Sequence, residues 1–439
     1  MLQFKQGLRF GRPGSFGALA TCCAVLSGTV LSGLPAWSNV AQVVEVRGAE
    51  FIPADDIQAT CGVEAGVAYS ALELRAIEGC LMSTGVFETV RLYTEAQTLV
   101  IEVQELNTRP GKIEAMLAYD SQDGLLGSLA FEQYNFLPKT FATLSLDYND
   151  EVERISGALY RADAFDAHTD LGLRFSAMRR EYDDVSYTQE QILGEVFVAW
   201  TPSDALRIET GIGYRDYRLF DVEAGASALL VQEETDSISE PFLHMSLSYG
   251  EPIFGGQGAY RLRLDQYLWN YGSDERLLDT RVQANATLPL ADGLSLLVGL
   301  NGGKVHGLDD NDTRGIDRYF PGANTFRGFA PRGIGPRDSG DALGGNQFFV
   351  GSLELQQEFG DVWNAPLRGG VFLDSGAAWG LDNTLSGGID DGWHRRTSVG
   401  LTLTLDVGNT PVSLYLAKPL EQEDGDETQA FGFSISTRF

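Results

Sequence analysis

Alternation of apolar and polar side chains along most of the chain constrains the fold more than any other feature. From Gly111 to Phe439, alternating segments of about ten or more residues are separated by clusters of Gly, Asp, Asn and Pro. In residues 141–148, for example, one face carries Ala142, Leu144, Leu146 and Tyr148, and the other carries Thr143, Ser145 and Asp147. A period of two gives each strand one face for lipid and one for an aqueous lumen. The pattern predicts a mainly β fold, a transmembrane barrel.

Sixteen such segments can be counted, an even number, as a closed antiparallel barrel with both ends on one side of the membrane requires. They start near Lys112, Leu125, Thr140, Arg154, Thr169, Thr188, Leu206, Glu240, Ala259, Arg281, Leu294, Gln347, Gly369, Thr397, Pro411 and Ala430. Tight connections, such as 137–139 and 408–410, alternate with longer ones. A soluble all-β sandwich also alternates, but it does not explain sixteen strands together with the features of the two chain ends.

Residues 1–38 have the composition of an export signal peptide. Three basic residues precede a mostly apolar stretch from Phe16 to Leu34, and the small residues Ala36 and Ser38 follow it, which predicts cleavage after Ser38. A lipoprotein signal ending at Cys22 is the alternative, but it would leave the apolar residues up to Leu34 in the mature chain. No later apolar run is long enough to span a bilayer as a helix.

Charge and motif content exclude several functions. The net charge is −29, and removal of residues 1–38 would take away three basic and no acidic residues, leaving −32. So acidic a chain is not suited to nucleic acid, whose phosphates bind Lys and Arg. Scattered histidines and the lack of a nucleophile elbow or phosphate loop predict no enzyme and no cofactor. A calcium loop at Asp310–Asp312 is disfavoured because Arg314 takes a ligand position and the closing Glu is missing, so no metal site is predicted.

Residues 39–106 have a mixed pattern that predicts a small α+β domain. An extended start at 43–46, helices at 53–60 and 70–83, and strands at 89–94 and 98–103 give the order β-α-α-β-β. This order suits a small sheet covered on one face by two helices. Cys61 and Cys80 are the two cysteines left after cleavage, in what should be an oxidising compartment. We expect a disulfide that ties the two helices together, with two unpaired core thiols as the alternative.

The same segment resembles a POTRA domain, the polypeptide-transport module of outer-membrane assembly and secretion proteins. The resemblance lies in a turn at Gly48, in the stretch Gly79–Phe87 and in the following Val90–Leu92. It implies a domain in the periplasm, joined to the barrel by a short linker at 107–111.

The longest connection, residues 306–346, lies between the eleventh and twelfth strands and is rich in Gly, Arg and Asp. Long loops inside compact folds are usually functional. Its core is Phe326-Arg327-Gly328-Phe329, followed by Gly-Pro-Arg-Asp at 335–338 and Gly-Gly-Asn at 344–346. Strand alternation predicts that Glu354 and Asp374, on the next two strands, face the lumen.

These residues resemble the BamA/TamA-like outer-membrane assembly and secretion superfamily, with its (V/I/F)RG(F/Y) loop. The resemblance implies that the loop folds back into the barrel, where Arg327 binds Glu354 and Asp374, and that this arrangement is needed for activity. It also includes a strand motif with Phe372 and Gly376. Two carboxylates can share the five donors of one guanidinium. The structural alternative is a surface loop with an incidental arginine.

The last segment is amphipathic and ends on an aromatic residue. Phe431, Phe433, Ile435 and Phe439 share one face. This resembles the signal by which bacterial outer-membrane proteins reach the barrel-assembly machinery. It predicts localisation in the outer membrane, but porins share it, so it does not separate the possible functions.

The resemblance implies an outer-membrane protein that assists insertion of proteins into that membrane or their translocation across it. Its partners would be unfolded client proteins, the lipid bilayer and periplasmic factors. A client strand would pair with a sheet edge of the POTRA-like domain, then leave through the lumen or through a seam between residues 112–119 and 431–439. A two-partner-secretion transporter is one alternative, although two POTRA domains and a plug helix are not found. A passive channel or structural surface barrel is the other.

Overall fold

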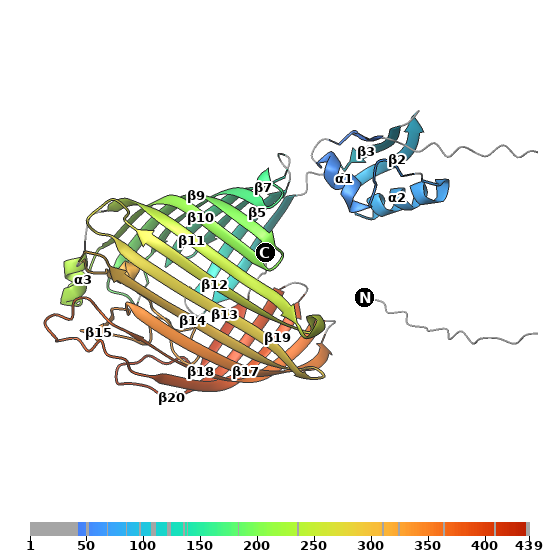
Figure 1. Cartoon of the computed structure of the whole chain (residues 1–439). Coiled ribbons are helices and arrows are strands. Elements are labelled where there is room, and N and C mark those ends of the chain that lie inside the picture. The colour runs from blue at the N-terminus through green and yellow to red at the C-terminus, as the bar shows by residue number, and fades with distance from the viewer. Residues whose placement is uncertain are drawn as a thin grey trace, which may run out of the picture.

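The computed structural model consists of a small α+β domain followed by a sixteen-stranded barrel (Figure 1). It describes residues 43–435 except 50–51, 68, 85, 96–97, 107–110, 121–123, 135–136, 138, 183, 235–236, 310, 324, 363–364 and 408–409. The predicted signal peptide and Phe439 lie outside the described residues. In the described part of the chain, no helix has both the length and the apolar character needed to cross a membrane.

The small domain is a three-stranded sheet packed against two helices, in the predicted order β-α-α-β-β. Its elements are β1 (Val43–Arg47), α1 (Ala54–Thr60), α2 (Ala71–Ser83), β2 (Phe87–Glu95) and β3 (Thr98–Glu105). β3 lies between the other two strands, parallel to β1 and antiparallel to β2. The buried apolar residues are Ile57, Val63, Ile77, Leu81, Phe87, Leu92, Leu99, Ile101 and Val103. The domain therefore has a hydrophobic core of its own.

Local chemistry explains where α2 begins. Ser70 is its N-cap: the Ser70 hydroxyl accepts a hydrogen bond from the Glu73 amide, and the Glu73 carboxylate accepts one from the Ser70 amide. This reciprocal pair satisfies two backbone donors that the first helical turn leaves unpaired. The hydrogen bonds from Ser70 also hold the pKa of the Glu73 carboxyl below its ordinary value.

A disulfide and a glycine turn constrain the rest of the small domain. A disulfide joins Cys61, at the end of α1, to Cys80 in α2, and so ties the two helices together. Gly48 follows β1 with a φ of +83°, and a Cβ there would lie 2.1 Å from the Val103 carbonyl oxygen. Only glycine fits this turn, because any side chain would collide with the backbone of β3.

The sixteen predicted strands form one antiparallel sheet in chain order, and its end strands β4 and β21 are neighbours, so the sheet closes into a barrel. The strands are β4 (Gly111–Asp120), β5 (Gly124–Tyr134), β6 (Thr140–Tyr148), β7 (Val152–Asp166), β8 (Thr169–Arg180), β9 (Thr188–Ser203), β10 (Leu206–Phe220), β11 (Ile238–Ile253), β12 (Gly258–Trp269), β13 (Leu277–Ala291), β14 (Leu294–Gly307), β17 (Gln347–Val362), β18 (Ala365–Trp379), β19 (Arg396–Val407), β20 (Thr410–Glu421) and β21 (Phe431–Ile435). The predicted fold class and strand number are confirmed.

Shorter elements lie in the connections between these strands. They are α3 (Ala228–Glu233), the 3-10 turns η1 (Phe254–Gly256) and η2 (Gly315–Asp317), and the two-residue strands β15 (Arg337–Asp338) and β16 (Asp341–Ala342). The small domain lies at the end of the barrel opposite α3 and the long connections (Figure 1). We call the end with the long connections the outer end.

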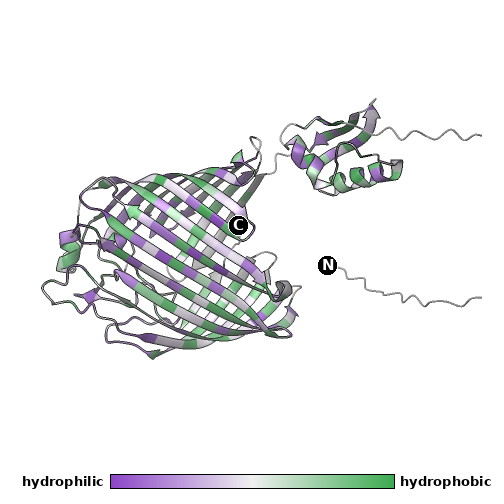
Figure 2. Ribbon diagram, in the orientation of Figure 1, coloured by the Kyte–Doolittle hydropathy of each residue, from purple (hydrophilic) through white to green (hydrophobic). Residues whose placement is uncertain are grey.

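The wall of the barrel has an apolar outside and a polar inside. Apolar and polar residues alternate along the strands in Figure 2. In β17, Leu353 and Leu355 are 47% and 39% exposed on the outside, whereas Glu354 between them is 8% exposed. In β18, Leu373 is likewise exposed and Asp374 is buried. Glu354 and Asp374 therefore face the lumen, which is the direction that alternation predicts.

The outer end is covered by connections that pack together. One apolar cluster contains Tyr187, from the β8–β9 connection, Leu230 of α3, Leu343 of the β14–β17 loop, and Ile389 from the β18–β19 connection. The β8–β9 connection and the β18–β19 connection start from different sides of the barrel. Contact between them therefore has to cross the opening. The cluster therefore forms a cap over the lumen, which we call the outer cap.

Candidate functional site

The loop between β14 and β17 enters the lumen, where Arg327 binds carboxylates on two neighbouring strands. Nη1 of Arg327 donates to Oε2 of Glu354 at 2.6 Å. Nε and Nη2 donate to Oδ2 and Oδ1 of Asp374 at 2.9 and 2.8 Å. The side chains of Arg327, Glu354 and Asp374 are 15%, 11% and 2% exposed. The guanidinium thus makes a bidentate pair with one carboxylate and a single bond to the other, out of bulk water.

The register of β17 and β18 brings a ring beneath the arginine. Ser352 lies opposite Asp374, and Glu354 lies opposite Phe372, so all four face the lumen as two neighbouring cross-strand pairs. The guanidinium carbon of Arg327 is 3.6 Å from the centre of the Phe372 ring. A cation at this distance from an aromatic face contributes roughly 1–2 kcal/mol when it is shielded from water.

Two hydroxyl groups add hydrogen bonds to the carboxylates. Ser352 Oγ accepts from Arg327 Nη2 at 2.9 Å and donates to Asp374 Oδ1 at 2.6 Å. Thr402 Oγ1, from β19, donates to Glu354 Oε1 at 2.7 Å. One cation faces two anions here, and these extra donors help to offset the cost of burying the second carboxylate. The sequence interpretation missed Ser352 and Thr402.

The apolar residues and the glycine of the motif shape the loop around Arg327. Phe326 and Phe329 are fully buried, with ring centres 4.8 Å apart, and they pack with other apolar residues of the loop and β17. Gly328 has a φ of +97°, and a Cβ there would lie 2.8 Å from Cβ of Ser398. The hydroxyl of Ser398 in turn donates to the Arg327 carbonyl oxygen. The turn after Arg327 thus needs glycine for both its backbone conformation and its close approach to β19.

The other predicted residues lie in the wall of the barrel. A Cβ at Gly376 would be 2.2 Å from the Phe349 carbonyl oxygen, so β17 and β18 approach closely there. In β21, Phe431 is 53% exposed and pairs with Leu416, which is also exposed on the outer face. Phe433 is half-buried, and the side chain of Ile435 lies outside what the structure describes, as does Phe439.

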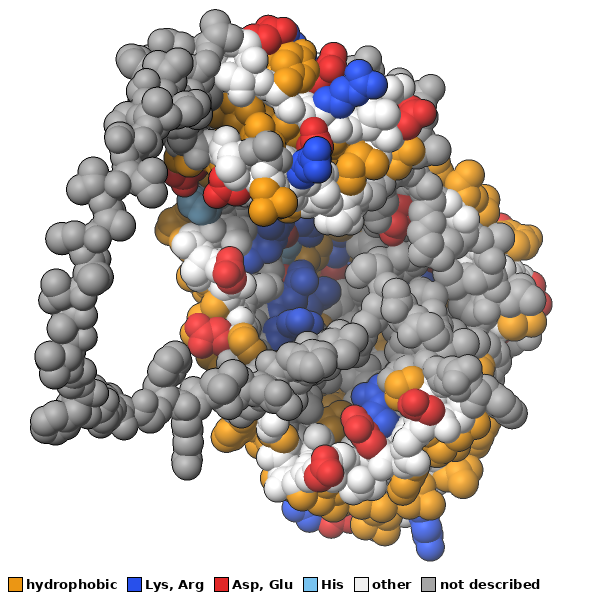
Figure 3. Space-filling view, turned by 90° about the vertical axis from the view of Figure 1, so that its right-hand side faces the viewer, with side chains coloured by type: hydrophobic (Ala, Val, Ile, Leu, Met, Phe, Trp, Pro, Cys, Tyr) orange, Lys and Arg blue, Asp and Glu red, His pale blue; other side chains and the backbone are white. Residues whose placement is uncertain are grey.

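Other strands of the barrel, among them β8 and β12, carry arginines that are paired with acids but still open to the lumen. Arg174 contacts Glu209 at 2.6 Å, and Arg263 contacts Asp265 at 2.7 Å; the two arginine side chains are 30% and 45% exposed. Figure 3 views the barrel from the end nearer the small domain and shows Lys and Arg side chains inside its hollow. The lumen is therefore polar along these strands as well.

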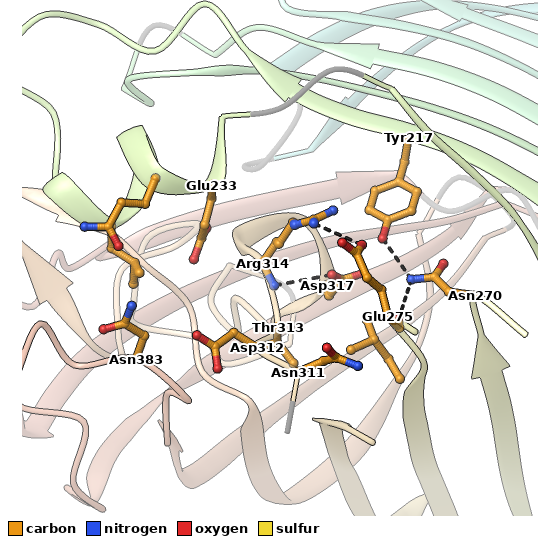
Figure 4. A pocket seen from close by; sticks show the side chains of 13 residues that line it. Tyr217, Glu233, Asn270, Glu275, Asn311, Asp312, Thr313, Arg314, Asp317 and Asn383 are labelled. Atoms are coloured by element: carbon orange, nitrogen blue, oxygen red, sulfur yellow. Dashed lines mark hydrogen bonds and ion pairs between the residues drawn. The ribbon is translucent and has the colours of Figure 1, made fainter. Parts of the chain in front are cut away.

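Residues 311–314 of the segment considered as a calcium loop line a cavity of about 370 Å³ at the outer end (Figure 4). Asp310 lies outside the described residues. The charged groups there are largely paired within the protein: Arg314 with Glu275 at 3.0 Å, and Asp317 with the buried Arg215 at 3.0 Å. Across the described residues, no group of three or more His, Cys, Asp or Glu side chains is placed to hold a metal ion. The cavity thus offers mixed amide and carboxylate groups.

Fold and site together define a class: a sixteen-stranded transmembrane barrel whose longest loop returns into the lumen and is bound there by wall carboxylates. The chain belongs to the Omp85 superfamily, because residues 140–439 match the model of the Omp85 superfamily domain. This match covers more than half of the chain and includes Arg327, Glu354 and Asp374.

Individual relatives agree with this assignment. The chain is 26% identical over 384 residues to "Outer membrane protein assembly factor BamA" of Neorickettsia risticii (strain Illinois), which covers 82% of this chain and 50% of that protein. It is 25% identical over 353 residues to "Sorting and assembly machinery component 50 homolog A" of Xenopus laevis, covering 75% of this chain and 72% of the relative. The chain thus spans half the length of the bacterial relative.

A solved structure has the same fold. The crystal structure of BamA from Haemophilus ducreyi lacking POTRA domains 1-3 superimposes with a TM-score of 0.75 at 20% identity. The superposition covers 90% of this chain and 84% of that chain. That share of this chain is larger than the barrel alone, so the likeness extends into the small domain.

Proposed function

We propose that this protein lies in the outer membrane of a bacterium and assists the insertion of other proteins into that membrane. The observation that carries the proposal is the contact of Arg327 with Glu354 and Asp374, because it holds the longest loop of the barrel inside the lumen. A loop bound this way lies in the path of anything that enters the lumen and can respond to it. The names of the two relatives, both assembly components, support the same activity.

The small domain is the proposed site of client capture in the periplasm, as a POTRA-like domain with β1 and β2 at the edges of its sheet. An unfolded client strand can pair with such an edge through backbone hydrogen bonds that do not depend on side-chain identity. Residues 1–38 would direct export and then be removed. Unfolded outer-membrane proteins are the proposed clients, with lipid and periplasmic factors as further partners.

The experiment is an Arg327→Ala substitution in cells that depend on this protein. We expect the variant to reach the outer membrane and fold, as shown by its heat-modifiable gel mobility, while the levels of client barrels fall. Arg263→Ala is the matched control, because it also removes a lumen arginine with an acidic partner, on β12, a strand that does not bind the loop. Normal client levels with Arg327→Ala would show that the loop contact is not needed for assembly.

The outer cap weighs against a passive channel, since connections from different sides of the barrel meet across its opening. Conductance in planar bilayers tests this rival. We expect only small, intermittent conductance from the parent protein. A wide and steady pore, unchanged by Arg327→Ala, would favour the channel over assembly.

A further inference from the structure

The tip of the lumen loop pairs with the connection that leads into the last strand, residues 422–430. The Ala330 amide donates to the Glu427 carbonyl oxygen at 2.9 Å, and the Glu427 amide donates to the Gly333 carbonyl oxygen at 2.9 Å. The Gln429 amide donates to the Gly328 carbonyl oxygen at 3.0 Å. These are ladder-like bonds between two irregular segments almost a hundred residues apart. Gly328, the residue after Arg327, is thus bonded to a residue that lies two positions before the start of β21.

A buried ion pair holds the same connection against the wall. Arg396, at the start of β19, donates through Nε and Nη2 to the two carboxylate oxygens of Asp426, both at 2.9 Å. The two side chains are 5% and 2% exposed. Arg337 of the loop adds a contact with Glu427 at 2.9 Å. A bidentate pair this well shielded fixes geometry as well as charge.

The beginning of the last strand is also held by its neighbours in the sheet. β21 starts at Phe431, two residues after Gln429, and pairs with β20 over five residues. Just before it, the Ala417 amide donates to the Ala430 carbonyl oxygen at 2.8 Å. The other neighbour of β21 is β4, across the point where the sheet closes. The described part of β21 is short, so the loop contacts just before it add to what positions this strand.

We propose that Arg396 and Asp426 are positioning residues that couple the lumen loop to β21, so that displacement of the loop loosens the closure between β21 and β4. The role of this coupling rests on the proposed function, since a client that displaces the loop would open the route into the membrane. The coupling itself is a property of the barrel alone. It works in both directions, as any coupling between two sites must.

Hydrogen exchange measured by mass spectrometry on the full-length protein in lipid bilayers tests the coupling without any client. Asp426→Asn removes the charge that Arg396 binds. We expect the amides of residues 431–435 to exchange about tenfold faster or more, because breaking a buried pair leaves the other charge unpaired. Exchange should also rise in residues 325–329. A merely local role for Asp426 would change residues 422–430 alone.

Glu421→Gln is the control, since the neighbouring Arg395–Glu421 pair has the same chemistry but is 63% and 44% exposed. Gly333→Ala breaks the pairing from the loop side, because its Cβ would lie 2.4 Å from the Glu427 carbonyl oxygen. It should accelerate exchange in residues 431–435 even if Asp426→Asn fails to fold. Parent-like exchange there in the folded variants would overturn the coupling. Faster exchange combined with normal client levels in Arg327→Ala would instead refute the proposed function and leave the coupling standing.

Discussion

At the scale of single residues, the two carboxylates bound by Arg327 are not equivalent. Asp374 accepts two guanidinium bonds and the Ser352 hydroxyl, and its side chain is 2% exposed. Glu354 accepts one guanidinium bond and the Thr402 hydroxyl, and its side chain is more accessible, at 11% exposed. An amide at position 374 would offer one acceptor oxygen and turn an NH2 group towards the guanidinium donors. Asp374 is thus the main partner that holds the loop.

We therefore expect Asp374→Asn to weaken the attachment of the loop by about 3–5 kcal/mol, as breaking a buried ion pair does. Glu354→Gln should cost about 1–3 kcal/mol. The free energy of loop opening can be measured from hydrogen exchange of residues 325–329 in the folded barrel. Ser352→Ala is the control, since it keeps both charges. Equal effects of the two amide substitutions on the free energy of loop opening would show that Asp374 is not the main partner of Arg327.

Arg327, Glu354 and Asp374 could be picked out from the sequence, because a motif marks the first and strand alternation gives the facing of the other two. Ser352 and Thr402 could not. Thr402 lies two strands from Glu354, and its contact depends on the registers that place Gly370 opposite both Gln356 and Thr402. Register between strands is set by the hydrophobic pattern and by turn geometry, and these do not name the side chains that meet across two strands. A threonine on a polar lumen wall carries no sign of which partner it will meet.

At the scale of elements, the close approach of β17 and β18 depends on Gly376. Its Cβ would lie 2.2 Å from the Phe349 carbonyl oxygen and 2.9 Å from Cα of Val350, both backbone atoms that cannot turn aside. Gly376→Ala should therefore force the two strands apart beside Asp374. We expect a lower unfolding midpoint in urea and a destabilisation of roughly 1–3 kcal/mol, as overpacking costs.

Gly351→Ala is the matched control for Gly376→Ala. It lies in β17, and its Cβ would be 3.7 Å from the Phe349 ring, an ordinary contact. Both variants can be followed by the shift in gel mobility that accompanies unfolding of a barrel. If the two alanine variants have the same unfolding midpoint, the close approach at Gly376 does not contribute to the stability of the barrel.

The sixteen strands were predictable because each has its own period of two, which survives in a single sequence. The pairing of residues 328–333 with 427–429 was not. Both segments are irregular, and backbone hydrogen bonds between such segments leave no periodic signal in side-chain type. The disulfide could also be predicted, because Cys61 and Cys80 are the two cysteines that follow the predicted signal peptide, and each lies in or beside a predicted helix.

At the scale of the whole molecule, the small domain and the barrel have separate apolar cores. Among the described residues, no buried apolar cluster contains residues of both. The core of the small domain is made by residues 57–103, and the clusters of the barrel begin at Leu126. The superfamily match begins at residue 140. Two cores separated by a short linker should respond separately to anything that acts on one of them.

The Cys61–Cys80 disulfide gives a test of this independence. It closes a segment with a sequence separation of 19 residues, and loss of such a cross-link costs about 3 kcal/mol through the entropy gained by the unfolded chain. We expect a Cys61→Ala, Cys80→Ala double variant to lose that stability in the small domain, measured by hydrogen exchange of β3. The barrel should keep its unfolding midpoint, measured by tryptophan fluorescence, since residues 39–106 contain no tryptophan. A matching fall in the barrel midpoint would mean that the two parts unfold as one unit. The proposed capture of a client by the small domain and its insertion by the barrel would then not be separable steps.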